Sequence, residues 1–450
     1  MKKTFLFLLF FFQLIFLCFS QEWEWTKTAG GPSSDKVTGV AMDLTGNVFI
    51  CGYFDSLIAF DSTRLISAGG TDVFIAKYDA DGILLWAKQV GGQNDDFASA
   101  ISTDITGNCY ITGFFFIQGT TTTFGNTTIS EAGDADIFVS KFNANGNLLW
   151  VRNGGGRTED ASFGIATDVS GNSYVTGYFT GTALFGNTKI TSIGYSDIFV
   201  AKYDAGGNLV WIKTGGGTYQ DEPFAISTDI AGNCYVTGYF TGNATFSGVN
   251  LQSAGYFDSD VFLVKYNPSG LLIWARRIGG TGNEIGYGIS VAKNGSIFIS
   301  GMFRGEKSFG DNVLTRASGS NGFLAKLDIF GKIVWTRSTN GSNLNEFRKV
   351  STDAAGNCYA AGSITNNVLF GNISMTSSGG KDACVAKYDT KGNLMWVLQA
   401  GGEEEDEAMC VSSDAAGNCF AVGQFTSSAT FGRPKFSGWG AQDIFISRIK

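Results

Sequence analysis

The tryptophans recur at a nearly constant interval, and this repeat limits the fold more than any other feature of the chain. Aligned on one register, they are Trp25, Trp86, Trp150, Trp211, Trp274, Trp335 and Trp396, at intervals of 61, 64, 61, 63, 61 and 61 residues. Six of the seven are followed 18 residues later by an Asp that opens a D-x-x-G-N sequence. A period near 61 with strand-like segments inside each unit predicts a β-propeller or a β-solenoid.

One repeat can be read as four strands. Residues 163–168 form a short run rich in small side chains, residues 169–172 a tight turn, and residues 173–179 an alternating strand, which together indicate a hairpin. Residues 197–203 and 208–213 indicate a second hairpin. We therefore predict strands a to d in each repeat. The Asp and Gly-Asn residues are predicted to serve the turns through side-chain bonds to the backbone and positive φ angles.

The two ends of the chain favour a ring over an open stack. Residues 22–27 read as a strand d, and residues 444–450 as a strand c with no strand d after it. Pairing of these two segments would leave no open sheet edge. We therefore expect an all-β fold: a single seven-bladed β-propeller of four-stranded blades over residues 21–450, closed by pairing of the N-terminal strand with the last blade. Strand a, which contains small residues such as Gly164 and Ala225, is predicted to lie innermost.

The repeats resemble a known family, the SBBP-type seven-bladed propeller repeats of bacterial exported proteins. The resemblance is carried by IATDVSGNSYVTGYFTG at residues 165–181 and DIFVAKYDAGGNLVW at residues 197–211, and it covers nearly all of residues 21–450. It implies the propeller fold and export from the cell. It supplies no catalytic residues.

The N-terminal segment predicts export independently of the repeat. Lys2 and Lys3 precede a run from Phe5 to Phe19 that is apolar except for Gln13, which is typical of a secretory signal peptide over residues 1–20, cleaved after Ser20. No later segment is apolar enough to span a membrane. We expect the mature chain in the periplasm, on the cell surface or outside the cell.

Composition excludes several kinds of function. The chain has no His, which rules out every mechanism that needs an imidazole base and removes the commonest zinc ligand. Removing Lys2 and Lys3 from 32 basic residues leaves 30 against 40 acidic ones, a net charge near -10. Nucleic acid is therefore a poor partner. As a separate expectation, we take the chain to be a monomer.

The cysteines do not predict a disulfide framework. Seven remain after residue 20, an odd number, and four of them share one repeat position, whose copies on packed sheets about 10 Å apart lie too far from one another to bond. We interpret them as small buried apolar residues. They are Cys51, Cys109, Cys234, Cys358, Cys384, Cys410 and Cys419.

Acidic residues ten positions after the tryptophans are the first candidate site. They are Asp35, Asp96, Asp160, Asp221, Glu284 and Asp406, with Asn345 beside Glu346 in the sixth repeat. If they circle the mouth of the channel, they would favour a bound cation or a cationic partner, and calcium is the natural ion. Alternatively, each accepts backbone N–H bonds at the start of strand a, which explains the repetition by repeated structure. We assign no metal ligand and no required cofactor.

Aromatic residues outside the repeat register are the second candidate site. The d–a links and b–c segments share one face, which we call the b–c face, and insertions at residues 114–123 and 255–260 enlarge it. Aromatic side chains there could stack on sugars or anchor a peptide, or they could pack within their loops. They are Phe115, Phe116, Tyr195, Tyr219, Tyr256, Phe257 and Trp439. Phe residues that keep the register are predicted to fill the core.

These features favour an exported, non-enzymatic binding scaffold that presents loops of the b–c face to a protein or glycan partner, with calcium as a candidate structural cation. The alternative is a calcium-dependent, lactonase-like hydrolase at the channel mouth, because metal-bound water needs no His. We assign no catalytic residue.

Overall fold

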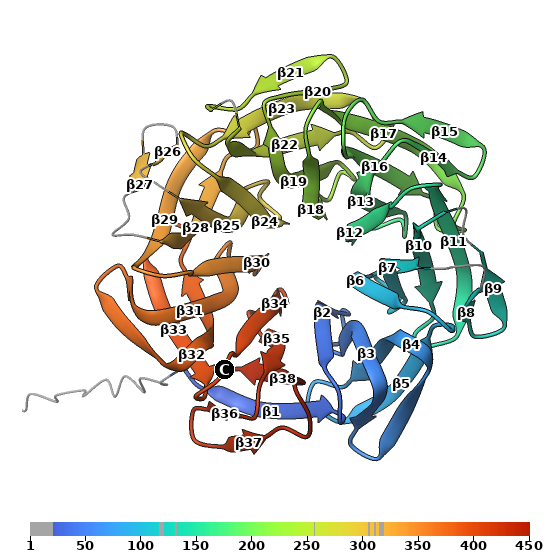
Figure 1. The fold of residues 1–450 in the computed structure, drawn as a ribbon. Coiled ribbons are helices and arrows are strands. Elements are labelled where there is room, and N and C mark those ends of the chain that lie inside the picture. The colour runs from blue at the N-terminus through green and yellow to red at the C-terminus, as the bar shows by residue number, and fades with distance from the viewer. Residues whose placement is uncertain are drawn as a thin grey trace, which may run out of the picture.

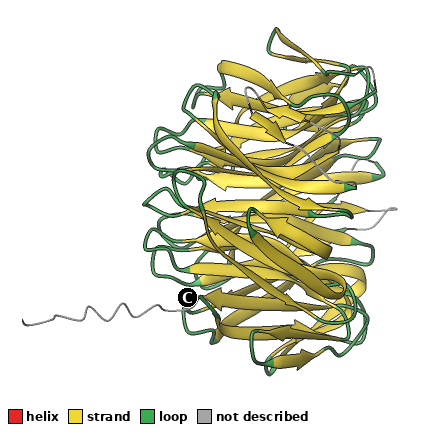
Figure 2. Cartoon of the chain, turned by 90° about the vertical axis from the view of Figure 1, so that its left-hand side faces the viewer, coloured by secondary structure: helices red, strands yellow, loops and turns green. Residues whose placement is uncertain are grey.

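A computed structural model of the chain describes residues 21–116, 121–130, 133–255, 257–304, 307–309, 312–314 and 319–450. These residues form β-strands joined by short turns and contain no helix, so none of them provides a helix that could cross a membrane. The strands run across the thickness of the molecule, with loops on both faces (Figure 2). The predicted signal peptide, residues 1–20, lies outside the described residues.

The first strand of each repeat, strand a, lies next to a central opening (Figure 1). This confirms the prediction from its small side chains that strand a is innermost. The inner strands are β2 (Asp35–Met42), β6 (Asp96–Thr103), β12 (Ala161–Thr167), β18 (Asp221–Thr228), β24 (Glu284–Val291), β30 (Glu346–Thr352) and β34 (Glu407–Ser413).

Strands b, c and d follow outward from each inner strand in antiparallel order. Strands b are β3 (Val48–Phe60), β7 (Cys109–Phe116), β13 (Ser173–Phe179), β19 (Cys234–Thr241), β25 (Ile297–Arg304), β31 (Cys358–Phe370) and β35 (Cys419–Phe425). Strands c are β4 (Thr63–Tyr78), β10 (Ala135–Phe142), β16 (Asp197–Tyr203), β22 (Ser259–Tyr266), β28 (Ser320–Leu327), β32 (Ile373–Tyr388) and β38 (Asp443–Ile449). Strands d are β5 (Leu84–Val90), β11 (Leu148–Gly156), β17 (Leu209–Gly217), β23 (Leu272–Ile278), β29 (Ile333–Gly341), β33 (Leu394–Gly401) and, for the seventh repeat, β1 (Trp23–Gly30).

The b–c segments form hairpins at the outer edge. In the first and sixth repeats the hairpin continues strands b and c, and in the others it is separate. Several of these hairpins add to strand d of the preceding repeat, as where β14 pairs with β11. Each such pairing joins one repeat to the next by backbone hydrogen bonds. The separate hairpins are β8 (Thr122–Phe124) with β9 (Thr127–Ile129), β14 (Thr182–Phe185) with β15 (Thr188–Thr191), β20 (Asn243–Phe246) with β21 (Val249–Gln252), β26 (Lys307–Phe309) with β27 (Asn312–Leu314), and β36 (Ser428–Phe431) with β37 (Lys435–Ser437).

The two ends of the chain pair with each other. β1 runs antiparallel to β38, from Trp23 opposite Ile449 to Ala29 opposite Ile444. The end of β1 also pairs with the outer part of β3, where Ala29 lies opposite Phe60. The N-terminal strand therefore supplies the strand d that the seventh repeat lacks and links that repeat to the first.

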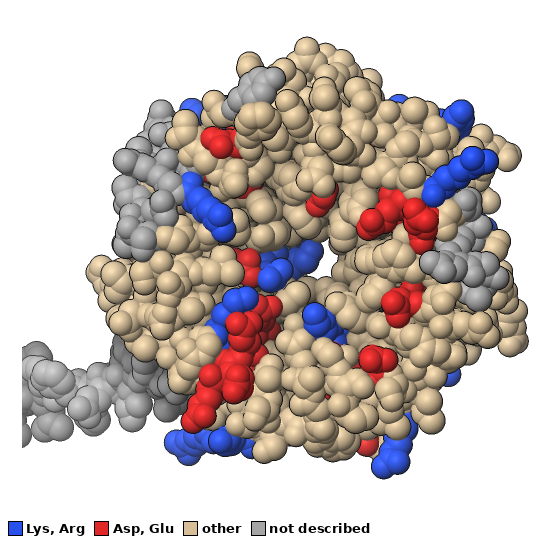
Figure 3. All heavy atoms as spheres, viewed as in Figure 1, with Lys and Arg blue, Asp and Glu red and all other residues tan. Residues whose placement is uncertain are grey.

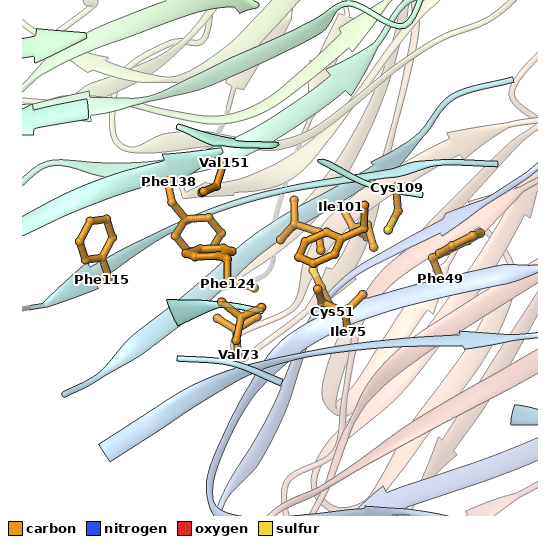
Figure 4. Packing of buried hydrophobic residues seen from close by; sticks show 14 of the residues in the cluster. Phe49, Cys51, Val73, Ile75, Ile101, Cys109, Phe115, Phe124, Phe138 and Val151 are labelled. Carbon is orange, nitrogen blue, oxygen red and sulfur yellow. The ribbon is translucent and has the colours of Figure 1, made fainter. Parts of the chain in front are cut away.

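The core consists of apolar layers between adjacent sheets. One buried cluster combines Phe49, Cys51 and Val73 of the first repeat with Phe115 and Phe138 of the second (Figure 4). The register phenylalanines other than Phe309 fill such layers; Phe60, Phe185 and Phe370, for example, are fully buried. This confirms their prediction as core residues.

The repeated tryptophans cap the next repeat. The Trp86 indole N–H donates to the Ala144 carbonyl at 3.1 Å, and Trp150 donates to Ala205 at 3.1 Å. The ring lies over a turn glycine: a Cβ on Gly146, which has φ 75°, would lie 3.1 Å from Trp86. Trp25, Trp211 and Trp335 make the same bond, so the tryptophan period reflects a structural contact that recurs at five of the seven tryptophans.

The D-x-x-G-N sequences form turns, as predicted. Asp43 Oδ1 accepts the backbone N–H of Thr45 at 2.9 Å and of Asn47 at 3.0 Å, and Lys77 Nζ lies 3.6 Å from Asp43 Oδ2. The seven cysteines described are free and buried, which confirms that they form no disulfide framework.

Candidate functional site

The acidic residues predicted to circle the channel mouth lie at or just before the start of strand a and are buried. Asp221 shows their usual geometry: Oδ2 accepts the Gly217 N–H at 2.7 Å, and Oδ1 accepts the Thr241 N–H at 3.1 Å. Asp160 and Asp406 make the equivalent two bonds. Asp96 accepts the Gly92 N–H and the Thr122 hydroxyl, and Glu284 accepts the Gly280 N–H. These five side chains therefore bind their own surroundings, as the structural alternative predicted. Asp35 is the exception, because both of its carboxylate oxygens are buried without these bonds.

A second acidic residue lies close to most of these carboxyls, at the start of strand c of the preceding repeat. A Cβ on Gly216 would lie 2.6 Å from Asp197 Oδ1 and 3.1 Å from Asp221 Oδ2, so both carboxyls flank the same glycine. Burial raises the pKa of Asp221 to about 7, and the negative charge of Asp197 adds to the rise. The junction is therefore a carboxyl pair that favours holding a proton.

Equivalent pairs recur around the molecule. Burial is the main cause of each raised pKa, and the negative charge of the partner carboxylate contributes. The pKa of Asp35 rises to about 8 with Asp443 as partner. The pKa of Asp96, Asp160 and Asp406 rises to about 7 with Asp72, Asp136 and Asp382 as partners.

The sixth repeat corrects one predicted member of the set. Asn345, not Glu346, stands ten residues after the tryptophan, and its Oδ1 accepts the Thr365 N–H at 2.9 Å as the aspartates do elsewhere. Its partner across the junction is Asn321. The Asn321 Nδ2 donates to the Gly341 carbonyl, and its Oδ1 accepts the Gly341 N–H. Glu346 lies one residue further on, and one of its carboxylate oxygens lies 2.7 Å from Arg348. One junction is thus built from amides in place of carboxyls.

The described residues contain no group of three or more Cys, Asp and Glu side chains placed to hold a metal ion. Calcium binding stays a prediction from the sequence.

A β-bulge interrupts each inner strand at the same point. In β18 the pairing with β19 shifts between Pro223 and Ala225, which leaves Phe224 without a pairing partner, and the other inner strands show the same shift. A bulge re-aims the side chain of the extra residue. The bulged residues stand thirteen positions after each tryptophan: Thr38, Ser99, Phe163, Phe224, Tyr287, Arg348 and Met409.

All of these bulged side chains line one pocket of about 520 Å³ at the mouth of the central opening. We call it the mouth pocket. Strand b contributes Tyr53, Phe114 and Phe116 to its wall, and strand a contributes Phe97. A ligand-sized pocket is thus assembled from one unpaired position per inner strand and residues near it.

Aromatic rings form a continuous arc along the wall of this pocket across the first five repeats. Phe97 stacks on Phe114 with 5.2 Å between ring centroids. The Phe224 ring lies 5.8 Å from the Phe163 ring and 5.3 Å from the Tyr287 ring. At the end of the arc the Arg348 guanidinium lies 5.7 Å from the Tyr287 ring. The aromatic arc therefore passes directly into a charged segment.

The charged segment belongs to the sixth and seventh repeats. Arg348 contacts Glu346 at 2.7 Å and Glu407 at 3.9 Å, and Glu407 also binds Lys381 at 2.6 Å. Lys349 lines the pocket as well. Basic side chains accordingly lie at the central opening over β30, with acidic side chains beside them (Figures 1 and 3). The mouth pocket is thus mainly apolar on one side and ionic on the other; the one carboxylate beside the arc is Glu159, whose Oε1 accepts the Tyr178 hydroxyl at 2.6 Å.

The predicted aromatic residues are dispersed. Phe116 lines the mouth pocket, whereas Phe115 is fully buried between sheets and is not available to a ligand, because neighbouring residues of a strand point to opposite faces. Tyr195, Phe257 and Trp439 are exposed, and Tyr219 contacts Phe257 at 6.0 Å. Tyr256 lies outside the described residues.

Sequence reasoning did not find most of the mouth pocket. Phe97, Phe163, Phe224 and Tyr287 were overlooked, as were Arg348 and Lys349, since strand a was read only for its small residues. The signal that could have found them is the position thirteen residues after each tryptophan, where large aromatic or charged side chains replace Thr and Ser in several repeats.

Three comparisons place the chain among known proteins. Residues 85–113 match a family model described as SBBP, beta-propeller repeat, which confirms the resemblance predicted from the sequence. The chain is 24% identical over 475 aligned residues to an uncharacterized WD repeat-containing protein, L264, of Acanthamoeba polyphaga mimivirus, covering 86% of this chain and 34% of that protein. It is 31% identical over 157 residues to the regulatory protein FlaEY of Caulobacter vibrioides, covering 33% of this chain and 16% of that protein.

Among solved structures, the WD40 domain of Neurospora crassa Pan2 aligns with a TM-score of 0.43 and 9% identity, over 93% of this chain and 89% of that one. The chain spans about a third of the length of the mimivirus relative and less of FlaEY. It is an all-β protein that carries an SBBP-type β-propeller repeat.

Proposed function

We propose that the chain is an exported, non-enzymatic binding scaffold: a monomeric, closed, seven-bladed β-propeller that receives a partner at the mouth pocket. One observation carries this proposal. The bulged position carries Thr, Ser, Phe, Tyr, Arg or Met in different repeats, and all seven of these side chains converge on a single pocket. Variation that gathers in one place is expected of a recognition site.

Ring closure is supported by the pairing of β1 with β38 and by the placement of the inner strands around the central opening (Figure 1). A closed ring leaves no exposed sheet edge, so the chain can stay soluble and monomeric without further contacts. A rigid ring also holds the bulged side chains in fixed positions, which lowers the entropy lost on binding.

The pocket wall favours a protein partner over a glycan. Five of the seven rings that line it belong to Phe, whose side chains offer no hydrogen bond to a sugar hydroxyl. Apolar anchors of a protein segment would fill such a wall, and the ionic side would fix the orientation.

Affinity capture tests the proposal. Residues 21–450 are immobilised and exposed to envelope and medium components, in calcium and in chelator. The test variant is F163S/F224S, because Ser99 occupies the same bulged position in the second repeat and shows that the scaffold accepts serine there. The control is Y195S/W439S, which removes two exposed aromatic side chains outside the pocket.

We expect a partner that the parent and the control retain and that F163S/F224S loses. Digestion of the captured material with protease or with glycosidase identifies its class. Equal capture by both variants would refute the mouth pocket as the recognition site, and loss in chelator would support the predicted calcium.

A further inference from the structure

Lys349 departs from the repeat at a position where small residues are the rule. The residue after each bulge is Gly39, Ala100, Gly164, Ala225, Gly288, Lys349 and Cys410. Adjacent inner strands approach closely there: a Cβ on Gly288 would lie 2.9 Å from the Lys349 Cα. A long side chain at this position has room only toward the central opening. Lys349 accordingly reaches to the Phe224 carbonyl of β18, at 3.4 Å.

The position of Lys349 separates two cavities. It lines the mouth pocket and also a narrower cavity of about 110 Å³ formed by the small residues of the inner strands. Its ammonium group therefore lies at the inner end of the mouth pocket, where a ligand that enters from the b–c face would meet it.

The charge of Lys349 is not neutralised within the described parts of the chain. No carboxylate there lies within 4.0 Å of its Nζ, and its contact with the Phe224 carbonyl is long for an ammonium group with three N–H donors. Burial lowers the pKa of Lys349, and the neighbouring Arg348 charge lowers it further. An anion bound at Nζ would supply the missing counter-charge and so stabilise the protonated form of Lys349.

Arg348 adds little net charge to the pocket, because its guanidinium is already balanced by Glu346 and Glu407. The two carboxylates would repel a multiply charged group such as a phosphate. The ionic side of the pocket is therefore matched to a single negative charge.

We propose that the mouth pocket binds a carboxylate that carries an apolar or aromatic group. Lys349 holds the carboxylate, and Phe163, Phe224 and Tyr287 contact the apolar group. This inference rests on the proposed function and gives it a ligand chemistry. The carboxylate could belong to a free small acid or to the carboxyl terminus of a peptide whose last residue is apolar.

Isothermal titration calorimetry tests it with matched pairs of probes. The free-acid pair is 4-phenylbutyrate and 4-phenylbutyramide, and the peptide pair is Gly-Gly-Phe with a free or an amidated carboxyl terminus. The test variant is K349M, which keeps the length of the side chain, and K349R retains the charge. The control is K88M, which removes an exposed lysine outside the pocket. Circular dichroism confirms that each variant is folded.

We expect the parent and K88M to bind an acid at least about tenfold more tightly than its amide. K349M should lose this preference for the acid, and K349R should restore part of it. Tighter binding of 4-phenylbutyrate than of the peptide indicates a small acid, and the reverse a peptide terminus. The inference is overturned if acid and amide bind equally, if K349M binds like the parent, or if the parent binds no acid.

The capture experiment separates this inference from the proposed function. If F163S/F224S loses the captured partner while the parent binds neither acid, the pocket is the recognition site and the carboxylate inference is wrong. If K349M loses the acid while F163S/F224S still captures the partner, the carboxylate site is real and the proposed function is wrong.

Discussion

From the carboxyl pairs at the repeat junctions we expect the stability of this protein to depend on pH, and one junction allows the effect to be isolated. Asp197 and Asp221 share a buried site, and Asn321 with Asn345 forms the corresponding amide junction. The double variant D197N/D221N therefore replaces a carboxyl pair by side chains that the protein already uses at an equivalent place.

The direction follows from the raised pKa. Asp221 titrates near 7 in the folded protein and near 3.8 in the unfolded chain, so between these pH values the folded state binds more protons. The free energy of unfolding then falls as pH rises from about 4 to about 8 and levels off above that range. A shift of about three pKa units corresponds to a loss of about 4 kcal/mol from this one junction.

Asparagine does not titrate, so the free energy of unfolding of the variant does not fall with rising pH at this junction. We expect D197N/D221N to equal the parent or be less stable at pH 5, where asparagine replaces a protonated carboxyl and offers one acceptor fewer. At pH 8 it should be more stable than the parent, by about 2 to 4 kcal/mol. Urea unfolding followed by tryptophan fluorescence at both pH values measures the difference.

The reciprocal variant N321D/N345D is the control. It creates a carboxyl pair where Asn321 and Asn345 donate to backbone carbonyls. The control variant should therefore be less stable than the parent at both pH values, and the difference in the free energy of unfolding should be larger at pH 8. If D197N/D221N keeps the same change in stability between pH 5 and pH 8 as the parent, the carboxyl pair does not hold the extra proton and the reasoning fails.

Three further predictions concern other parts of the molecule. K349M should raise the free energy of unfolding by about 1 kcal/mol, because it removes a half-buried charge with no counter-ion among the described residues, and a lower urea midpoint would contradict this. Six of the seven cysteines of the described chain are buried and line no pocket, so a thiol reagent should label them only after denaturant is added, whereas Cys410 lines the mouth pocket; rapid labelling of more than one thiol in the folded protein would contradict this. The mature protein recovered from the exported fraction should begin at Gln21 by mass spectrometry, whereas retention of residues 1–20 would contradict cleavage.

The sequence predicted the features whose causes are local or repeated. The Asp43 turn could be read from the chain because its hydrogen bonds reach only two and four residues ahead. Strand a could be placed innermost because its small residues recur at a fixed distance from each tryptophan. The structural role of the acidic residues was also foreseen as one of two alternatives, but their partners were not. Asp197 and Asp221 are 24 residues apart and meet only when strand c of one repeat packs beside strand a of the next.

The mouth pocket was missed because alternation within a strand does not reveal a bulge. In a regular strand Phe224 and Ala225 would face opposite sides of the sheet, so only one of the two could point to the opening. The bulge between Pro223 and Ala225 brings both positions toward the centre, Phe224 into the mouth pocket and Ala225 into the cavity below it. Nothing in a single repeat marks this irregularity, and only the comparison of all repeats at that position shows the variation.

The bulges also explain how one scaffold can keep its fold while its site changes. A bulged residue makes no regular cross-strand pair, and its side chain faces an open pocket, so Thr, Ser, Phe, Tyr, Arg and Met all occur there in one chain. The next position is different, because adjacent inner strands are in contact and small residues are required. Lys349 is the departure from that requirement, and it lies where the aromatic arc meets the ionic side of the pocket. A local rule broken at the centre of a variable site is better explained by selection for binding than by selection for stability.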